Sequence, residues 1–372
     1  MYSVQWIGFH ATSDTDNSHA ELPEVEPRVM RLTGPRLLPD LRGYSHSHSR
    51  PKIRELHQGF PQTDLITQAH TLEPAAIEME QFWKSITPYF ATQPFDIGLY
   101  RIVMEECSSL ASEPTDVTYE EVNCPGTVRP AIWCKPALAS PSRAILYLHG
   151  GAFIACSPAS HRKLAAHLAK KTGAYALLVD YRRAPEHQFP CQIEDVVSAY
   201  KWLLNNRGIS NSSICLAGDS AGGNLTVSVS LALRNQGIPM PAAIAAFSAW
   251  LDMRVAGESY KRNAVKDVLA DPDTLPGVIA TYLGGASLDD PLVDVLRADL
   301  KGLPPMYLTA GTAEVLESDA MTLARRAREA GIDVQLELPS DLQHIWICLA
   351  GNAAEADTTL SQAAAFLRKR ME

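Results

Sequence analysis

The chain has 372 residues, a formal net charge of −9, 46% hydrophobic residues and 20% charged residues, which is typical of a globular protein with one large or two ordinary domains. The acidic balance, without a long basic block, disfavours nucleic acid and anionic membranes as partners, and no apolar stretch approaches the roughly 20 residues of a membrane span. There is no signal-peptide pattern, and the seven cysteines show no paired spacing. We therefore expect free thiols and a cytoplasmic protein.

Residues 1–70 are rich in proline, histidine, serine and charged residues and show little apolar periodicity. This composition predicts an irregular N-terminal extension. His46 and His48 could suggest a metal site, but two histidines without further ligands are usually solvated. We expect no metal.

Two helical patterns occupy residues 71–112, ahead of the first strand. Apolar side chains recur at helical spacing in both, so each helix is expected to bury one face. These apolar residues are Ile77, Phe82, Trp83 and Ile86 in the first helix, and Leu99, Ile102 and Val103 in the second, which is predicted over 97–110.

Residues 113–372 have the pattern of an α/β domain. Two strand-like stretches, 117–122 and 128–133, flank a hairpin signal at Cys124-Pro125-Gly126. Strands and helices then alternate, which indicates a mostly parallel sheet with helices on both faces. The expected strands are 144–148, 174–179, 213–217, 242–249, 305–310 and 334–338, and the expected helices are 161–171, 194–204, 221–234, 318–330 and 354–370. The intervening 251–300 is polar and is expected to be irregular.

The segment Gly218-Asp219-Ser220-Ala221-Gly222-Gly223 lies between a predicted strand and a predicted helix. That is the context of a G-x-S-x-G nucleophile elbow. The turn strains the serine backbone, so glycines are needed where strand and helix crowd together. We expect Ser220 to project above the sheet as a nucleophile, with the Ala221 amide near the helix N-terminus to bind an oxyanion.

A nucleophilic serine needs a base and an acid that orients the base. Of eleven histidines only His344 follows Ser220 in the chain, and an imidazole titrating near ~6.5 can take up and return the serine proton. Three carboxylates follow the preceding strand. Glu314, the one closest to the strand end, is the preferred acid, whereas Asp319 could be a partner of the helix dipole and Glu317 a solvated side chain.

Three motifs occur in order: His149-Gly150-Gly151-Ala152-Phe153, then Asp180-Tyr181-Arg182-Arg183-Ala184-Pro185-Glu186, then Gly218–Gly223. Together they resemble the H-G-G-G-F-like loop, the D-Y-R-x-A-P-E segment and the G-D-S-A-G-G elbow of the hormone-sensitive-lipase-type branch of the α/β-hydrolases. The resemblance runs from about Thr118 to the C-terminus, and from about Pro74 with the cap helices included. It implies an α/β-hydrolase fold, with a mostly parallel sheet of about eight strands and a helical cap.

The resemblance implies a role for individual residues. The catalytic residues would be Ser220 as nucleophile, His344 as base and Glu314 as acid. The oxyanion donors would be the backbone amides of Gly150, Gly151 and Ala221, with Ala152 as a further candidate. His149 would hold the loop rather than act as a base, and Asp180, Arg182 and Glu186 would form a structural ion network beneath the site.

Two departures from the family pattern stand out. Ala152 replaces the third glycine of the oxyanion loop, which keeps the N–H but restricts the backbone. Asp341-Leu342-Gln343 precedes the base where the family has a small, glycine-containing turn. The first departure predicts a differently shaped acyl pocket, and the second an altered loop before His344.

The implied function is hydrolysis of short- to medium-chain or aryl carboxylic esters, with a small-molecule substrate and no cofactor. Related enzymes use the same residues as deacylases, lactonases, thioesterases or acyltransferases, so such a step in a biosynthetic pathway is the alternative. A third function is that of a non-catalytic, receptor-like ligand-binding protein. Receptors of this fold have lost the catalytic histidine, so His344 disfavours that function.

The resemblance places a cap over the cleft, formed by 71–112 and 251–290, where specificity is expected to reside. Four aromatic residues of these regions could line a pocket or be plain core. They are Phe82, Trp83, Trp250 and Tyr260. The resemblance also allows a homodimer.

Overall fold

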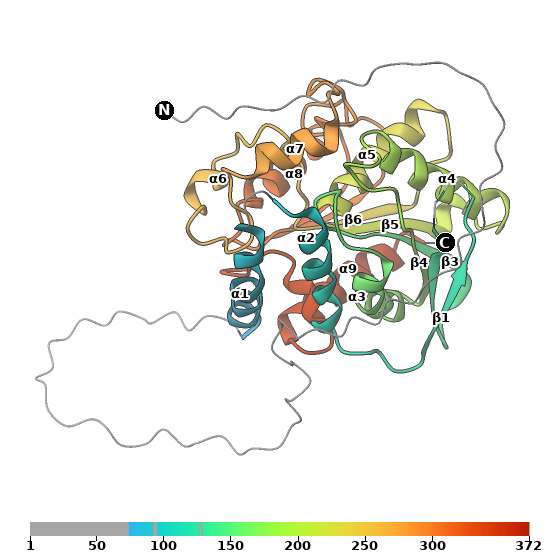
Figure 1. The fold of residues 1–372 in the computed structure, drawn as a ribbon. Helices are drawn as coiled ribbons and strands as arrows, with labels where there is room; N and C mark the ends of the chain where they lie inside the picture. The colour runs from blue at the N-terminus through green and yellow to red at the C-terminus, as the bar shows by residue number, and fades with distance from the viewer. Residues whose placement is uncertain (1–73, 92–94, 126, 128, 372) are drawn as a thin grey trace, which may run out of the picture. The chain divides into compact units, whose positions relative to one another are not determined.

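The structure is a computed structural model that describes residues 74–91, 95–125, 127 and 129–371. Its strands are β1 (Val117–Val122), β2 (Ala131–Pro136), β3 (Ser140–Leu148), β4 (Ala174–Leu178), β5 (Ile214–Asp219), β6 (Ala243–Phe247), β7 (Met306–Thr309) and β8 (Val334–Glu337). They form one sheet in the order β1-β2-β4-β3-β5-β6-β7-β8 (Figure 1). Only the β1–β2 and β2–β4 pairs are antiparallel. The predicted eight-stranded, mostly parallel sheet is confirmed.

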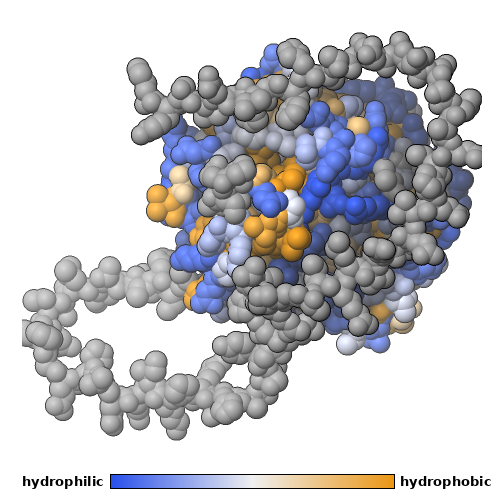
Figure 2. Space-filling view, viewed as in Figure 1, coloured by the Kyte–Doolittle hydropathy of each residue, from blue (hydrophilic) through white to orange (hydrophobic). Residues whose placement is uncertain are grey.

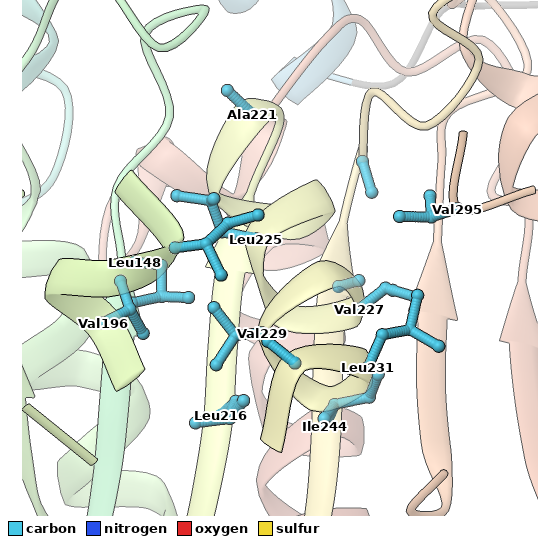
Figure 3. Close-up of a cluster of buried hydrophobic side chains, with 14 of the residues drawn as sticks. Leu148, Val196, Leu216, Ala221, Leu225, Val227, Val229, Leu231, Ile244 and Val295 are labelled. Carbon is cyan, nitrogen blue, oxygen red and sulfur yellow. The ribbon is translucent and has the colours of Figure 1, made fainter. Parts of the chain in front are cut away.

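Helices cover both faces of this sheet, and each face has its own hydrophobic core. One face carries α4 (Cys191–Asn205), α5 (Ala221–Asn235) and α8 (Glu317–Glu329), and the other carries α3 (Pro158–Thr172) and α9 (Ala354–Arg368). Side chains alternate along a strand, so Leu146 and Leu148 of β3 enter the first core, and Ile145 and Tyr147 the second. Figure 3 shows side chains of α5 packed on the strands in the first core.

The cap helices are α1 (Pro74–Ile86) and α2 (Ile97–Met104), each followed by a short 3₁₀ helix, η2 (Thr87–Ala91) and η3 (Glu105–Ser109). The buried face of α1 consists of Ala75, Ala76, Met79, Trp83 and Ile86. The prediction was right for Trp83 and Ile86 but wrong for Ile77, which is 42% exposed. At 3.6 residues per turn, position 77 points away from the stripe that the two alanines begin.

Other boundaries differ in smaller ways. The second cap helix ends at Met104 rather than Leu110, and Ile102 on it is 63% exposed rather than buried. The stretch 251–300 is not wholly irregular, because it contains α6 (Ser259–Arg262) and α7 (Leu275–Leu283). The predicted extension 1–70 lies outside the described residues. In the part of the chain that the structure describes, no helix has the length and apolar character needed to span a bilayer.

Candidate active site

Ser220 lies at a sharp turn between β5 and α5, with a backbone at φ 53° and ψ −121° that is unfavourable for a residue with a side chain. Its glycine neighbours allow this turn. A Cβ at Gly222 would overlap the carbonyl of Leu148, and a Cβ at Gly218 would overlap the carbonyl of Gly222. The strand–turn–helix context expected for a nucleophile elbow is therefore present around Ser220.

His344 and Glu314 lie beside this serine, each in the loop that follows the C-terminal end of a strand. His344 comes after β8, and its Nε2 is 3.0 Å from Ser220 Oγ. Glu314 comes after β7, and its Oε2 is 2.7 Å from His344 Nδ1. The structure thus brings together the three residues that the sequence singled out. They form one continuous chain of hydrogen bonds, which is the arrangement of a serine nucleophile, a base and an orienting acid.

Burial and charge set the proton affinity of His344, which is only 3% exposed. Burial alone would lower the pKa of His344, but the hydrogen bond and the negative charge of Glu314 outweigh it and raise this pKa. The histidine backbone is also held, because Trp83 Nε1 on α1 donates to His344 O at 3.1 Å. A cap helix therefore holds the loop that carries His344.

The carboxylate of Glu314 is fully buried, and its second oxygen is held by two donors. Ser248 Oγ donates to Glu314 Oε1 at 2.8 Å, and the Gly311 amide donates to the same oxygen at 2.6 Å. Ser248 Oγ also accepts a hydrogen bond from the Ile345 amide at 3.2 Å. Ser248, directly after β6, thus joins Glu314 to Ile345, the residue that follows His344. Sequence reasoning missed it, since a lone serine at a strand end has no distinctive spacing.

The other two carboxylates considered as acids have different partners. Asp319 is buried and accepts hydrogen bonds from the amides of Leu251 and Asp252, at 2.8 Å each, and from Tyr260 Oη at 3.0 Å. Burial raises the pKa of Asp319 to about 7. The side chain therefore anchors the start of the segment 251–290 rather than serving only the helix dipole.

Glu317 is not the solvated side chain that the sequence suggested. It is 9% exposed and pairs with Arg262 of α6. Asn263 Nδ2 also donates to Glu317 Oε2 at 3.2 Å. The reason is tertiary, because α6 folds back onto the first turn of α8 and supplies partners that are more than 50 residues away in the chain.

The loop after β3, which contains the residues expected to donate to an oxyanion, has an unusual backbone conformation. Gly151, Ala152 and Phe153 have φ angles of 101°, 56° and 63°, all in the left-handed region that favours glycine. The Phe153 ring stacks on Tyr282 of α7, with ring centroids 3.9 Å apart. The backbone of Ala152 is therefore strained, because its Cβ crowds the backbone in this left-handed conformation. This agrees with the expectation that alanine at this place in the motif restricts the backbone.

His149, at the start of this loop, is a buried neutral side chain. Its Nδ1 lies 2.7 Å from Gly150 O, and its ring stacks on Tyr181 at 4.2 Å between centroids. Burial lowers the pKa of His149 to about 3. These contacts suit the expected role of holding the loop.

The predicted ion network of Asp180, Arg182 and Glu186 is wrong. Asp180 pairs with Arg129 ahead of β2 at 3.4 Å, Arg182 with Asp195 of α4 at 2.8 Å, and Glu186 with Arg101 of α2 at 2.6 Å. The three side chains leave their loop toward different elements. They tie the segment after β4 to three parts of the fold instead of to one another.

Three of the four candidate pocket aromatics are core residues. Trp83, Trp250 and Tyr260 are at most 3% exposed, and only Phe82 is half-buried. Among the described residues, no group of three or more His, Cys, Asp or Glu side chains could hold a metal ion. His46 and His48 lie outside the described residues.

Comparison with known proteins places this site in a family. Residues 145–348 match the family model described as alpha/beta hydrolase fold. The chain is 39% identical to an acetyl-hydrolase of Streptomyces hygroscopicus over 238 residues, which is 64% of this chain and 79% of the relative. It is 36% identical to an esterase of Acinetobacter venetianus over 203 residues, which is 54% of this chain and 67% of the relative.

Solved structures agree with the sequence matches. The fold is similar to the crystal structure of an esterase from the bacterial hormone-sensitive lipase family, with a TM-score of 0.77 and 36% identity. The match covers 81% of this chain and 100% of that one. The expected α/β-hydrolase fold is confirmed. The chain therefore belongs to the α/β-hydrolase family and, within it, to the hormone-sensitive-lipase group of esterases.

Proposed function

We propose that this protein is a serine hydrolase of carboxylic esters, with Ser220 as nucleophile, His344 as base and Glu314 as orienting acid. The observation that carries the proposal is the unbroken line of hydrogen bonds from Ser220 Oγ through both ring nitrogens of His344 to Glu314 Oε2, at 3.0 and 2.7 Å. A serine hydroxyl is a weak nucleophile until an adjacent base can take its proton. A merely structural serine would not need that arrangement at a strained backbone position.

The reaction proceeds in two halves. Ser220 Oγ attacks the ester carbonyl carbon while His344 Nε2 takes the hydroxyl proton, and the ester C–O bond then breaks as His344 returns this proton to the leaving alcohol. Water next attacks the acyl-enzyme, losing a proton to His344, and the bond from the acyl carbon to Ser220 Oγ breaks as His344 returns this proton to Ser220 Oγ. Release of the acid then restores the free enzyme. Glu314 accepts a hydrogen bond from His344 Nδ1 throughout and stabilises the imidazolium.

Backbone amides would stabilise the negative oxygen formed in each half. Ala221 is the first residue of α5, so its N–H has no acceptor within the helix. The turn at Gly150, Gly151 and Ala152 supplies further N–H groups, because successive residues in left-handed conformations can aim their amides at one point. We propose these four amides as the oxyanion hole.

The cap would cover the cleft from two sides. The α1 side chain Trp83 bonds the His344 backbone, while Asn263 in the segment 251–290 donates to Glu314 O at 2.7 Å. On the face seen in Figure 1, apolar surface gathers near the middle and is bordered by hydrophilic residues, and smaller apolar areas lie elsewhere on this face (Figure 2). Exposed apolar side chains of the first cap region include Ile77, Phe95 and Ile102. Such a surface suits an uncharged, apolar ester.

The acyl group is proposed to be short. The support is the similarity to a protein named acetyl-hydrolase, together with the methyl group of Ala152 in the oxyanion loop. The alternative functions, which are deacylation, lactone opening, thioester cleavage and acyl transfer, use the same residues. They differ in the leaving group or in the acceptor that replaces water.

The test is a substrate panel with the unmodified protein and two variants. We expect p-nitrophenyl acetate and butyrate to be cleaved faster than matched amides, lactones and thioesters. Ser220→Ala should lose at least about 10⁴-fold in kcat, whereas Ser361→Ala, on the exposed face of α9, should keep full activity. Negligible cleavage of every short ester, or an active Ser220→Ala variant, would contradict the proposal. An added alcohol acceptor shows whether acyl transfer competes with hydrolysis.

A further inference from the structure

A second histidine–carboxylate pair lies directly beneath the nucleophile elbow. Asp219, the residue before Ser220, has its Oδ2 3.3 Å from His161 Nε2 of α3 and its Oδ1 2.9 Å from Tyr147 Oη of β3. Asp219 is 0% exposed and His161 is 1% exposed. The proposed reaction uses neither side chain. A buried carboxylate without a counter-charge is unfavourable. The protonation state of His161 therefore decides whether the charge of Asp219 is compensated.

The hydrogen bonds around His161 fit a proton on each ring nitrogen. Ser160 Oγ lies 2.9 Å from His161 Nδ1. It can donate its one hydrogen to Ser157 O at 2.8 Å, while it accepts from the Ser157 amide at 3.0 Å. With its hydrogen so placed, Ser160 Oγ has a second lone pair that can accept a proton carried by His161 Nδ1. On the other side, Nε2 faces the carboxylate of Asp219, which accepts. This arrangement suits an imidazolium.

This pair lies against the oxyanion loop. Gly150 is so close to Asp219 that a Cβ at position 150 would overlap Asp219 Oδ2, and it would lie 3.2 Å from Ser220 Cβ. The Asp219 carboxylate is thus wedged between the loop that would supply oxyanion donors and the helix that carries His161. A shift of the carboxylate toward the loop would displace Gly150.

We propose that His161 and Asp219 form a buried ion pair that holds the oxyanion loop against the nucleophile elbow, so that His161 is a positioning residue for ester hydrolysis. The inference rests on the proposed function, because it concerns the loop that would bind the oxyanion. The pair keeps the Asp219 charge compensated and in place. Without a positive charge on His161, the negative charge of the buried Asp219 carboxylate is not compensated. The loop at Gly150, Gly151 and Ala152 then moves away from the nucleophile elbow.

The electrostatics of the pair set a pH range for this effect. Burial alone would lower the pKa of His161, but the charge and hydrogen bond of Asp219 raise it to about 9. Burial would likewise raise the pKa of Asp219, yet His161 and Tyr147 hold it below its ordinary value. A raised histidine pKa means stabilisation that is present at neutral pH and lost as pH rises through about 9.

Other titratable groups face the pair from several elements. Those groups are Tyr147 of β3, His149 directly after β3, Tyr181 after β4, Glu105 and Cys107 on η3, Cys156 after the Gly150–Phe153 turn, His344, and Cys348 on η5 (Trp346–Leu349). Burial raises the pKa of Tyr147 well above its usual value, and burial lowers that of His149 to about 3. Both are therefore neutral between pH 7 and about 9. His161 remains the group expected to change charge near pH 9.

The test compares His161→Gln, Asp219→Asn and the double variant with the unmodified protein on p-nitrophenyl acetate. Each single change should lower kcat on the order of 10²-fold, with KM little altered, because donors are displaced rather than substrate contacts removed. The double variant, which restores a neutral pair, should recover roughly tenfold over His161→Gln. The unmodified protein should lose kcat with an apparent pKa near 9, and the double variant should not.

A purely structural role gives a different result. His161→Gln would then lower the melting temperature while leaving kcat of the folded protein and its pH profile unchanged, which would overturn the inference. A kcat of the unmodified protein that stays flat to about pH 10 would also overturn it, even if the single variants did not fold. Ser220→Ala separates the two claims. If that variant is inactive and His161→Gln behaves as the parent, only the ion-pair inference fails.

Discussion

The two halves of the candidate site are built differently. One half, the base side, consists of His344, Glu314 and Ser248. Hydrogen bonds between side chains position it, because Ser248 donates to Glu314 and Glu314 bonds His344. The other half, the oxyanion side, is the loop at Gly150, Gly151 and Ala152. Its geometry depends on the backbone, because Gly151 and Ala152 have left-handed φ angles of 101° and 56°. The first half should therefore respond to changes in charge and hydrogen bonding, and the second to added or removed volume.

The largest effect short of removing the nucleophile should come from the charge on the base side. Glu314→Gln should lower kcat on the order of 10³- to 10⁴-fold, because an amide can hold His344 in the wrong tautomer and cannot stabilise its imidazolium. Since Glu314 raises the pKa of His344, the acidic limb of kcat/KM should also move to lower pH. Both are read from rate profiles between pH 5 and about 9.

The matched control is Glu329→Gln on the exposed end of α8, where the glutamate pairs with Arg325 at the surface. That change should leave both kcat and the pH profile as they are. A Glu314→Gln variant whose acidic limb stays in place would show that Glu314 does not set the pKa of His344.

A smaller loss is expected from volume added on the oxyanion side. Gly150→Ala should reduce kcat by roughly 10²- to 10³-fold, because its methyl group would overlap the Asp219 carboxylate and push the loop away from Ser220. Gly277→Ala on α7 adds the same methyl group where nothing lies within 4 Å and should have no effect on kcat. Equal rates for the two variants would argue against a fixed oxyanion loop.

Removing one hydrogen bond on the base side should lower kcat by a smaller factor than either of these changes. Ser248→Ala should lower kcat about tenfold, because a hydrogen bond to a buried carboxylate is lost and the Ile345 amide is left without its acceptor. KM should change little, since Ser248 does not face the substrate in the proposed reaction. A Ser248→Ala enzyme with parental kcat would mean that Gly311 alone is enough to hold Glu314.

The smallest effect is expected from volume removed on the oxyanion side. Ala152→Gly relieves a left-handed backbone strain of about 1–2 kcal/mol, but glycine also costs about 0.5–1 kcal/mol in chain entropy. The free energy of unfolding should therefore rise by no more than about 1.5 kcal/mol, as measured by urea denaturation. Because the N–H is kept, acetate hydrolysis should persist, while longer acyl esters gain relative to acetate. A loss of acetate hydrolysis would assign the methyl group a direct role.

Much of this architecture is predictable from local patterns. Residue types and their order are enough to predict the elbow around Ser220, the histidine downstream of it and the acid after a strand. Each proposed catalytic role needs one particular type of side chain shortly after a strand ends. The cap helices were harder. The spacing of bulky apolar residues predicts a buried Ile77, whereas the buried face of α1 begins with the small side chains of Ala75 and Ala76.

The parts that the sequence could not predict depend on partners far along the chain. Glu186 pairs with Arg101 at a separation of 85 residues, and His161 with Asp219 at a separation of 58. No local pattern specifies such pairs, because the partners of Asp180, Arg182 and Glu186 lie on elements outside their own motif. The contact between Ser248 and Glu314 is unpredictable for the same reason, since the two residues meet only because β6 and β7 are adjacent in the sheet.

If Ser220 forms the covalent acyl intermediate, an organophosphonate ester probe should react with it. The measurement is to label the unmodified protein with such a probe and to map the adduct by peptide mass spectrometry. We expect one adduct per chain, on Ser220, with esterase activity lost in proportion to labelling. An adduct on another residue, or full activity in a fully labelled protein, would show that Ser220 is not the nucleophile.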